Sequence, residues 1–258
     1  MKLLIQIRQL WFDLLTAVQF LTRLPVPSGP YEQDSLARAV KFFPIVGLMI
    51  GSGSLLLYRL IARHLPVTVV GLLVVVYLVA ITGCLHEDGL ADSVDAFGGG
   101  WERERVLAIM RDSRIGAYGA ASLVLSLIAR VLLIASLPRV QVAGYLIMAP
   151  VLSRWTTLPL SFFLSPARER SENHVDGQGA RIAKLTTLSS LVVGSLFTFV
   201  IAFAFLRIRA LVPVMVSLAV ALVTALYYKH RIGGATGDCF GATNQLTEIA
   251  VYLCGVWA

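Results

Sequence analysis

Long apolar stretches separated by short polar segments dominate the pattern of the chain. Six stretches are close to the roughly 20 residues that a helix needs to cross a bilayer, and they predict spanning helices over 42–60, 67–85, 116–137, 142–164, 188–206 and 210–228. A seventh stretch, 235–257, differs because Asp238 and Glu248 interrupt it. The pattern predicts an all-α, polytopic membrane bundle of about six or seven transmembrane helices.

The first 23 residues follow another pattern, in which polar positions interrupt the apolar ones. Trp11, Leu14 and Val18 recur at helical spacing, whereas Asp13 and Arg23 break the apolar run. This is typical of a helix that lies in the membrane interface. No small-residue cleavage site follows it, so we expect the segment to be retained rather than removed as a signal peptide.

Composition agrees with a membrane protein. Of 258 residues, 57% are apolar and 14% charged, and the mean hydropathy is +0.77; this is too apolar for a soluble domain of this length. We predict one membrane-embedded domain over 1–258. The net charge of +7 does not indicate a nucleic-acid partner, because the basic residues are spread over short loops. The three cysteines, Cys84, Cys239 and Cys254, show no paired spacing and are expected to be reduced.

The distribution of basic residues predicts the orientation. If Lys41 is cytoplasmic, alternate crossings place the polar segments 86–115, 165–187 and 229–234 on the same side, and these carry most of the loop arginines and lysines. An excess of positive charge marks the cytoplasmic side. We therefore expect a multi-pass protein of the cytoplasmic (inner) membrane whose active face is cytoplasmic.

The most unusual polar segment is 86–95, with the sequence HEDGLADSVD. In a helix, at about 100° per residue, Asp88, Asp92 and Asp95 share one face. Such carboxylates repel one another unless a cation lies between them, and Mg²⁺ is commonly bound by one or two carboxylates together with substrate phosphates. We interpret the segment as a metal and phosphate site at the mouth of the bundle. The alternative is a solvated acidic helix start, which the helix dipole favours.

A glycine-rich segment, GGATGD at 233–238, precedes the last apolar stretch. Glycines leave backbone N–H groups accessible to phosphate, and a helix N-terminus favours anions. Asp238 follows directly, and an ionisable residue at membrane depth is a functional candidate. A glycine hinge with Asp238 as a helix cap is the alternative.

Two arginines stand directly before the predicted span 116–137. Arg111 and Arg114 are three residues apart, so on a helix they could hold phosphate oxygens together. The alternative is that these arginines are positive charges that flank the span on its cytoplasmic side. Held on one membrane face, the acidic, arginine and glycine segments would supply the groups needed for phosphoryl transfer.

These segments resemble those of a known family. HEDGLADSVDA at 86–96, MRDSRIG at 110–116 and GGATGD at 233–238 are similar to motifs of the cobalamin synthase family, adenosylcobinamide-GDP ribazoletransferase, as are FLTRLP at 20–25 and FPIVG at 43–47. The resemblance runs from about Phe20 to Glu248. It implies a membrane enzyme that joins adenosylcobinamide-GDP to α-ribazole or its 5′-phosphate, releases GMP and uses Mg²⁺. The expected partners are these substrates and membrane lipid, and a homo-oligomer is possible.

The candidate site residues fall into three groups. The metal ligands are Asp88, Asp92, Asp95 and Asp238. The catalytic group is His86, Glu87, Asp88 and Asp92, with His86 as the candidate base because its imidazole titrates near neutrality. The candidates for phosphate or substrate binding are Arg111, Asp112, Arg114, Gly233, Gly234, Thr236 and Gly237.

Three other functions compete with this interpretation. A CDP-alcohol phosphotransferase has a similar Asp-Gly-x-x-Ala opening, but Asp92 stands where that family has arginine. A membrane prenyltransferase needs a second aspartate-rich motif, and only Asp238 is present. A transporter would use intramembrane acids such as Glu248 and would show inverted repeats, which the sequence lacks.

Two features have no assigned role. The loop 165–184 is either a flexible linker or a lid over the substrates. Arg130 and Arg154 lie inside predicted spans, where they either pair across the bundle or extend to the interface.

Overall fold

A computed structural model of the chain describes residues 2–27, 34–167 and 186–257. All the secondary-structure elements in these ranges are helices, which confirms the predicted all-α class. Of the predicted loop 165–184, residues 168–184 lie outside the described residues. The α-helices are α1 (Lys2–Leu21), α2 (Ser35–Ala39), α3 (Phe43–Ile61), α4 (Val67–Thr82), α5 (Leu85–Gly99), α6 (Arg103–Ile109), α7 (Ala117–Ser136), α8 (Val142–Trp155), α9 (Thr157–Phe163), α11 (Leu188–Leu206), α12 (Leu211–Ile232) and α13 (Gly237–Trp257).

Helix α8 is buried along nearly its whole length and packs mainly against α3, α13 and α11. Glycines of α3 allow a close contact with α8. A Cβ atom at Gly51 would lie 2.7 Å from the Cα atom of Ile147, and one at Gly47 would meet the carbonyl oxygen of Pro150. Backbones approach this closely only where side chains are small. These glycines therefore let the backbones of α3 and α8 pack in direct contact.

By length and hydropathy, the described residues contain four candidate membrane spans, or five if the bent pair of α4 and α5 forms one span. The candidates are Ser35–Ile61, Ala117–Ser136, Val142–Phe163 and Leu188–Ile232. They indicate a multi-pass membrane protein but are fewer than the six or seven predicted. Helices α11 and α12 fall into one candidate, and α13 is not among them because it carries several polar residues.

The predicted span 67–85 is not one continuous helix. Helix α4 ends at Thr82, and the next helix is bent by 89° from it. Gly83 and Cys84 both adopt left-handed backbone angles, with φ of 63° and 62°. Two successive left-handed residues cannot continue a right-handed helix. Helix α5, with four carboxylates in its 15 residues, therefore begins in a new direction, and we place it outside the apolar spans.

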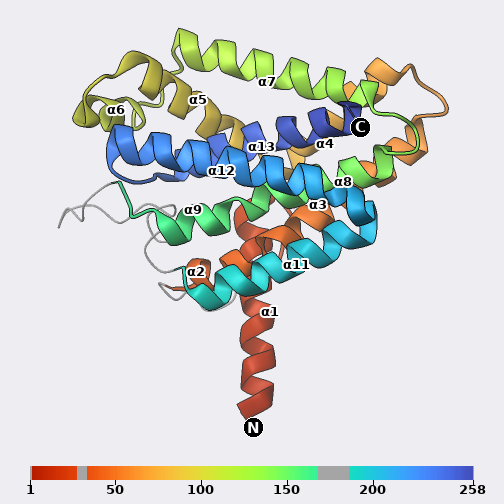
Figure 1. The fold of residues 1–258 in the computed structure, drawn as a ribbon, viewed down its shortest axis with the longest axis horizontal. Helices are drawn as coiled ribbons and strands as arrows, with labels where there is room; N and C mark the ends of the chain where they lie inside the picture. Colours follow the sequence, from red (N-terminus) through yellow and green to blue (C-terminus); the bar gives the residue numbers. More distant parts are fainter. Residues whose placement is uncertain (1, 28–33, 168–185, 258) are drawn as a thin grey trace.

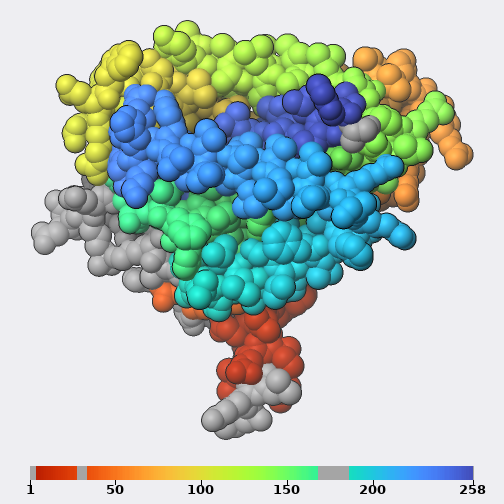
Figure 2. Space-filling view, in the orientation of Figure 1, coloured from red at the N-terminus to blue at the C-terminus, as the bar shows by residue number. Residues whose placement is uncertain are grey.

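Helix α1 projects from the body of the bundle (Figures 1 and 2). Its C-terminal half is anchored by Asp13, whose buried carboxylate lies 2.9 Å from the Lys41 Nζ atom and 3.3 Å from the Arg38 Nε atom. Its N-terminal half exposes Leu4, Ile5, Ile7, Leu10 and Trp11. The predicted helix is confirmed, and its place in the membrane interface stays a prediction.

Candidate functional site

The acidic segment forms helix α5, as predicted, and α5 crosses α13 at a pair of glycines. A Cβ atom at Gly89 would lie 2.9 Å from the Asp238 carbonyl oxygen and 3.1 Å from the Gly241 Cα atom. The two backbones therefore touch. This contact brings the carboxylates of α5 beside the first turn of α13, about 150 residues further along the chain.

Carboxylates from both helices gather at this crossing. Asp88 is exposed, and Asp92 and Asp238 are partly exposed. Partial burial, followed by the nearby carboxylates of Asp88, Asp238 and Asp95, raises the pKa of Asp92 from 3.8 to about 6. Such a shift is expected where like charges share one site. The sequence predicted that the three aspartates of α5 lie together, and the crossing adds Asp238.

Asp95 has a structural partner. Its two carboxylate oxygens accept hydrogen bonds from the backbone N–H groups of Gly116 and Gly119, at 2.7 and 2.8 Å. These groups lie at the N-terminus of α7, where backbone donors lack partners within the helix. Asp95 therefore caps α7 and holds it against α5, and its predicted role as a metal ligand stays a prediction.

The donor atoms at the crossing are all hard oxygens, as Mg²⁺ prefers. Among the described residues, however, no three side chains of His, Cys, Asp or Glu converge closely enough to hold a metal ion by themselves. Mg²⁺ commonly keeps water and substrate phosphate among its ligands and takes only one or two carboxylates from the protein. The site fits binding of Mg²⁺ through one or two carboxylates together with water and substrate phosphate.

His86 and Glu87 point into the bundle, although the next residue, Asp88, is exposed. His86 is 4% exposed, and its Nδ1 atom has no hydrogen-bond partner among the described residues. Burial, then the positive charges of Arg154 and Arg130, lower the pKa of His86 well below its ordinary value. The imidazole is therefore neutral, but it lies behind the aspartate cluster rather than in it.

The arginine segment is not helical, contrary to the geometry assumed from the sequence. Helix α6 ends at Ile109, and Arg111 and Arg114 lie in the turn that follows. The Arg114 guanidinium donates to both oxygens of Asp112, with a shortest distance of 2.6 Å, which lowers the Asp112 pKa to about 2. The two arginines therefore do not form the helical pair that was predicted.

The same turn lies beside the glycine-rich segment. The Thr236 hydroxyl is 3.6 Å from the Met110 Sδ atom, and it accepts a hydrogen bond from the Cys239 N–H group at 3.4 Å. Met110 precedes Arg111, so the arginine turn meets the N-terminus of α13. The structure thus brings all three predicted segments together at one end of the bundle.

The glycines of this segment have structural reasons of their own. Gly233 ends α12 with φ of 77°, a left-handed angle that favours glycine. A Cβ atom at Gly234 would meet the Ser165 carbonyl oxygen, because the Ala235 N–H group donates to that oxygen at 3.0 Å. Phosphate binding by Gly233, Gly234, Thr236 and Gly237 stays a prediction.

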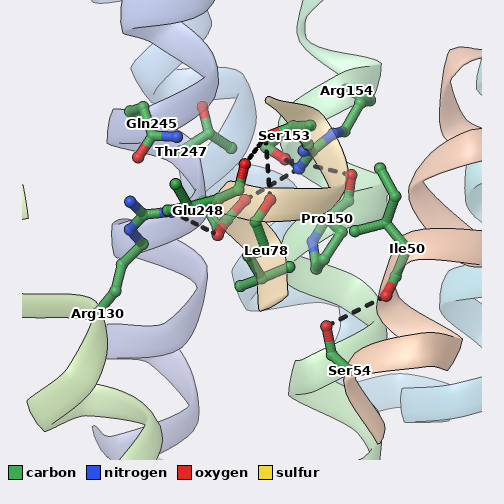
Figure 3. Close-up of polar contacts among 12 residues, drawn as sticks. Ile50, Ser54, Leu78, Arg130, Pro150, Ser153, Arg154, Gln245, Thr247 and Glu248 are labelled. Atoms are coloured by element: carbon green, nitrogen blue, oxygen red, sulfur yellow. Dashed lines mark hydrogen bonds and ion pairs between the residues drawn. The ribbon is translucent and has the colours of Figure 1, made fainter. Parts of the chain in front are cut away.

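A buried group of charges lies directly behind the site. Arg130 of α7 and Arg154 of α8 both contact Glu248 of α13, at 3.5 and 2.9 Å (Figure 3). The other end of the Arg130 guanidinium lies 2.9 Å from the Glu87 Oε1 atom. Of the two alternatives for Arg130 and Arg154, the structure shows pairing across the bundle. Glu87 was not foreseen as a partner, although an arginine buried in a span requires an acid at its own depth.

Comparison with known proteins identifies related chains along nearly the whole sequence. A family model described as CobS, cobalamin-5-phosphate synthase, matches residues 13–256. An adenosylcobinamide-GDP ribazoletransferase of Azorhizobium caulinodans is 41% identical over 254 residues, covering 95% of this chain and 94% of the relative. One of Sinorhizobium medicae is 37% identical over 263 residues, covering 95% and 96%. No solved structure is significantly similar.

Proposed function

The chain belongs to the cobalamin-5-phosphate synthase family, and on this premise we propose that the aspartate cluster at the α5–α13 crossing is the active site of an adenosylcobinamide-GDP ribazoletransferase. This activity belongs to cobalamin biosynthesis. The observation that carries the assignment is the convergence of Asp88, Asp92 and Asp238 at an exposed end of the bundle, beside the arginine turn and the N-terminus of α13.

The reaction exchanges the phosphoanhydride bond of a diphosphate for a phosphate ester bond. A ribose hydroxyl of α-ribazole, or of its 5′-phosphate, forms a bond to the cobinamide-side phosphorus of the diphosphate. The bond from that phosphorus to the GMP oxygen breaks, and the hydroxyl proton passes to a base. Because phosphoryl transfer needs little covalent help, the protein must mainly position the two substrates and balance their negative charge.

We assign Asp88 and Asp238, with Asp92 beside them, as the residues that would hold Mg²⁺. Burial first, and then the nearby carboxylates of Asp88 and Asp238, raise the Asp92 pKa, and the repulsion among these carboxylates supports a cation at this place. When bound, Mg²⁺ would neutralise the diphosphate and so stabilise the charge that develops on the leaving GMP. The exposed guanidinium of Arg111 adds a second positive charge at the same end of the bundle.

The proton of the ribose hydroxyl passes most directly to Asp92. Its carboxylate is partly exposed and lies beside Asp88 and Asp238, the residues assigned to Mg²⁺. His86 and Glu87 were also candidates for this role, but both are buried. We propose that these two residues support the site from behind instead.

The orientation follows from the charges of the loops. The aspartate cluster lies at the end of the bundle that carries Arg103, Arg105, Arg111 and Arg231, and such an excess marks the cytoplasmic side. We therefore propose that both nucleotide substrates bind from the cytoplasm and that lipid surrounds the apolar spans of the inner membrane.

Release of GMP tests this function directly. We expect the protein, purified and embedded in nanodiscs, to release GMP from adenosylcobinamide-GDP only when Mg²⁺ and α-ribazole or α-ribazole 5′-phosphate are both present. Chromatography of the products should show GMP and the joined corrinoid in equal amounts. Release of GMP without the second substrate would indicate a hydrolase instead, and consumption of a CDP-alcohol would indicate a different phosphotransferase.

The pKa of Asp92 predicts how pH and Mg²⁺ affect stability. Because its folded-state pKa of about 6 lies above the ordinary 3.8, its contribution to stability is fully present below pH 3.8 and is lost as the pH rises through about 6. We expect the melting temperature of the metal-free protein to fall between about pH 4 and about pH 6, and Mg²⁺ to restore it at about pH 7. Thermal unfolding of the Asp92→Asn variant should show neither effect. A normal response to Mg²⁺ in this variant would remove Asp92 from the metal site.

A further inference from the structure

We propose that Arg130 is a positioning residue that fixes helix α5 relative to helix α13 and thereby sets the geometry of the aspartate cluster. Arg130 does not reach the cluster itself. It lies inside the bundle, 1% exposed, on helix α7. The inference rests on the proposed active site and extends it to a residue that touches neither substrate nor metal.

The contacts of Arg130 join the two helices that carry the cluster. Its Nη2 atom lies 2.9 Å from Glu87 of α5, and its Nη1 atom lies 3.5 Å from Glu248 of α13. Figure 3 shows Glu248 between Arg130 and Arg154, which holds the other carboxylate oxygen at 2.9 Å. A planar guanidinium presents its donors in a rigid fork and so holds two carboxylates in a fixed geometry, whereas the donors of an ammonium group rotate and fix no such geometry.

A second set of contacts repeats this link. Gln245 of α13 donates to the Glu87 Oε1 atom at 3.1 Å, and Ser126 of α7 donates to the Gln245 Oε1 atom at 3.2 Å. Gln245 stands seven residues after Asp238, which is about two helical turns on the same face. Glu87 directly precedes Asp88. The buried contacts are therefore connected to the cluster by short, rigid stretches of helix on both sides.

Helix α7 packs against both α5 and α13. Asp95 of α5 caps its N-terminus through Gly116 and Gly119. Arg130, about four helical turns after Gly116, makes the contacts at the inner end. Helix α5 is thus held to α7 at two separate points, on either side of Asp88 and Asp92.

Stability alone does not explain this arrangement. Replacing a buried ion pair by apolar side chains of similar size is often neutral or stabilising, because the desolvation of two charges offsets their attraction. A buried quartet of two arginines and two glutamates is therefore weak evidence of a role in stability alone. Groups behind a metal site instead orient its ligands, and their loss commonly weakens metal binding about 10- to 100-fold.

Two variants separate positioning from stability. Arg130→Lys keeps the positive charge but removes the rigid fork that holds Glu87 and Glu248 in a fixed geometry. The double variant Glu87→Gln, Arg130→Met removes one charge of each sign and leaves Glu248 paired with Arg154. Asp13→Asn is the matched control, since it removes another buried and ion-paired carboxylate, one that joins α1 to the segment before α3.

The readout is binding of Mn²⁺, as a paramagnetic substitute for Mg²⁺, to the nanodisc-embedded protein without substrates. Free Mn²⁺ is measured by electron paramagnetic resonance, and thermal unfolding is recorded in parallel. We expect the Mn²⁺ dissociation constant to rise at least about tenfold in both Arg130 variants. The melting temperature of the double variant should stay near that of the wild type, and Asp13→Asn should bind Mn²⁺ normally.

The outcomes distinguish this inference from the proposed function. Arg130 variants that fold and bind Mn²⁺ as tightly as the wild type overturn the role of Arg130 and leave the active site intact. If the double variant does not fold, Arg130→Lys decides the question in the same way. A wild type that binds no Mn²⁺ contradicts the metal site of the proposed function itself, and the inference with it.

Discussion

Replacing Asp88 or Asp92 by asparagine should reduce GMP release by about 10³-fold in kcat/KM, which corresponds to about 4 kcal/mol of transition-state stabilisation. Asparagine keeps the size and the carbonyl oxygen of the side chain but removes the negative charge. In the proposed site Asp88 would lose affinity for Mg²⁺, and Asp92 would also lose the proton acceptor. The measurement is initial-rate kinetics over a range of Mg²⁺ concentrations.

The two variants should differ in their dependence on Mg²⁺. We expect excess Mg²⁺ to restore part of the activity of Asp88→Asn, because one ligand of several is weakened, and to restore little in Asp92→Asn, which lacks the base. Glu104→Gln is the control: this carboxylate belongs to the neighbouring helix α6, its side chain is 80% exposed, and its loss should leave the rate unchanged. Equal loss in the control would point to a general effect of surface charge, and full activity in both aspartate variants would rule out the cluster as the active site.

The sequence predicts the helices well and their breaks poorly. Hydrophobic periodicity placed α11 at Leu188–Leu206, as observed, and α3, α7, α12 and α13 within a few residues of their observed bounds. It did not predict the end of α4 at Thr82, because Gly83 and Cys84 lie within an unbroken apolar run. The left-handed angle of Cys84 is set by tertiary packing, which local propensity does not reveal.

The candidate site, too, was predicted from the sequence only in part. A helical period was sufficient to place Asp88, Asp92 and Asp95 on one face, and the resemblance to a family grouped them with Asp238. Glu87 is buried and Asp88 is exposed, and this difference depends on which face of α5 meets α13. That is a property of the contact between helices. The cap that Asp95 forms on α7 and the partners of Arg130 depend on it too.

Gly89→Ala should lower the transferase activity about 100-fold while the protein still folds. The new methyl group would lie 2.9 Å from the Asp238 carbonyl oxygen and 3.2 Å from the Asp238 Cα atom. Both are backbone atoms, so α5 and α13 must move apart. A displacement of about 1 Å within a catalytic site costs about 10²-fold in rate. Because the shift separates Asp88 and Asp92 from Asp238, the Mg²⁺ concentration for half-maximal activity should rise as well.

Gly99→Ala provides the matched control, since it makes the same change on the same helix. Its methyl group would lie 3.4 Å from the Ile109 Cδ1 atom, an ordinary contact with a side chain. Alanine favours a helix over glycine by up to about 1 kcal/mol, so this variant should be fully active and slightly more stable. If Gly89→Ala also retains normal kinetics and normal Mg²⁺ dependence, the close approach of α5 and α13 does not determine the geometry of the site. Loss of activity in Gly89→Ala alone would show that the reaction depends on carboxylates supplied by two helices in contact.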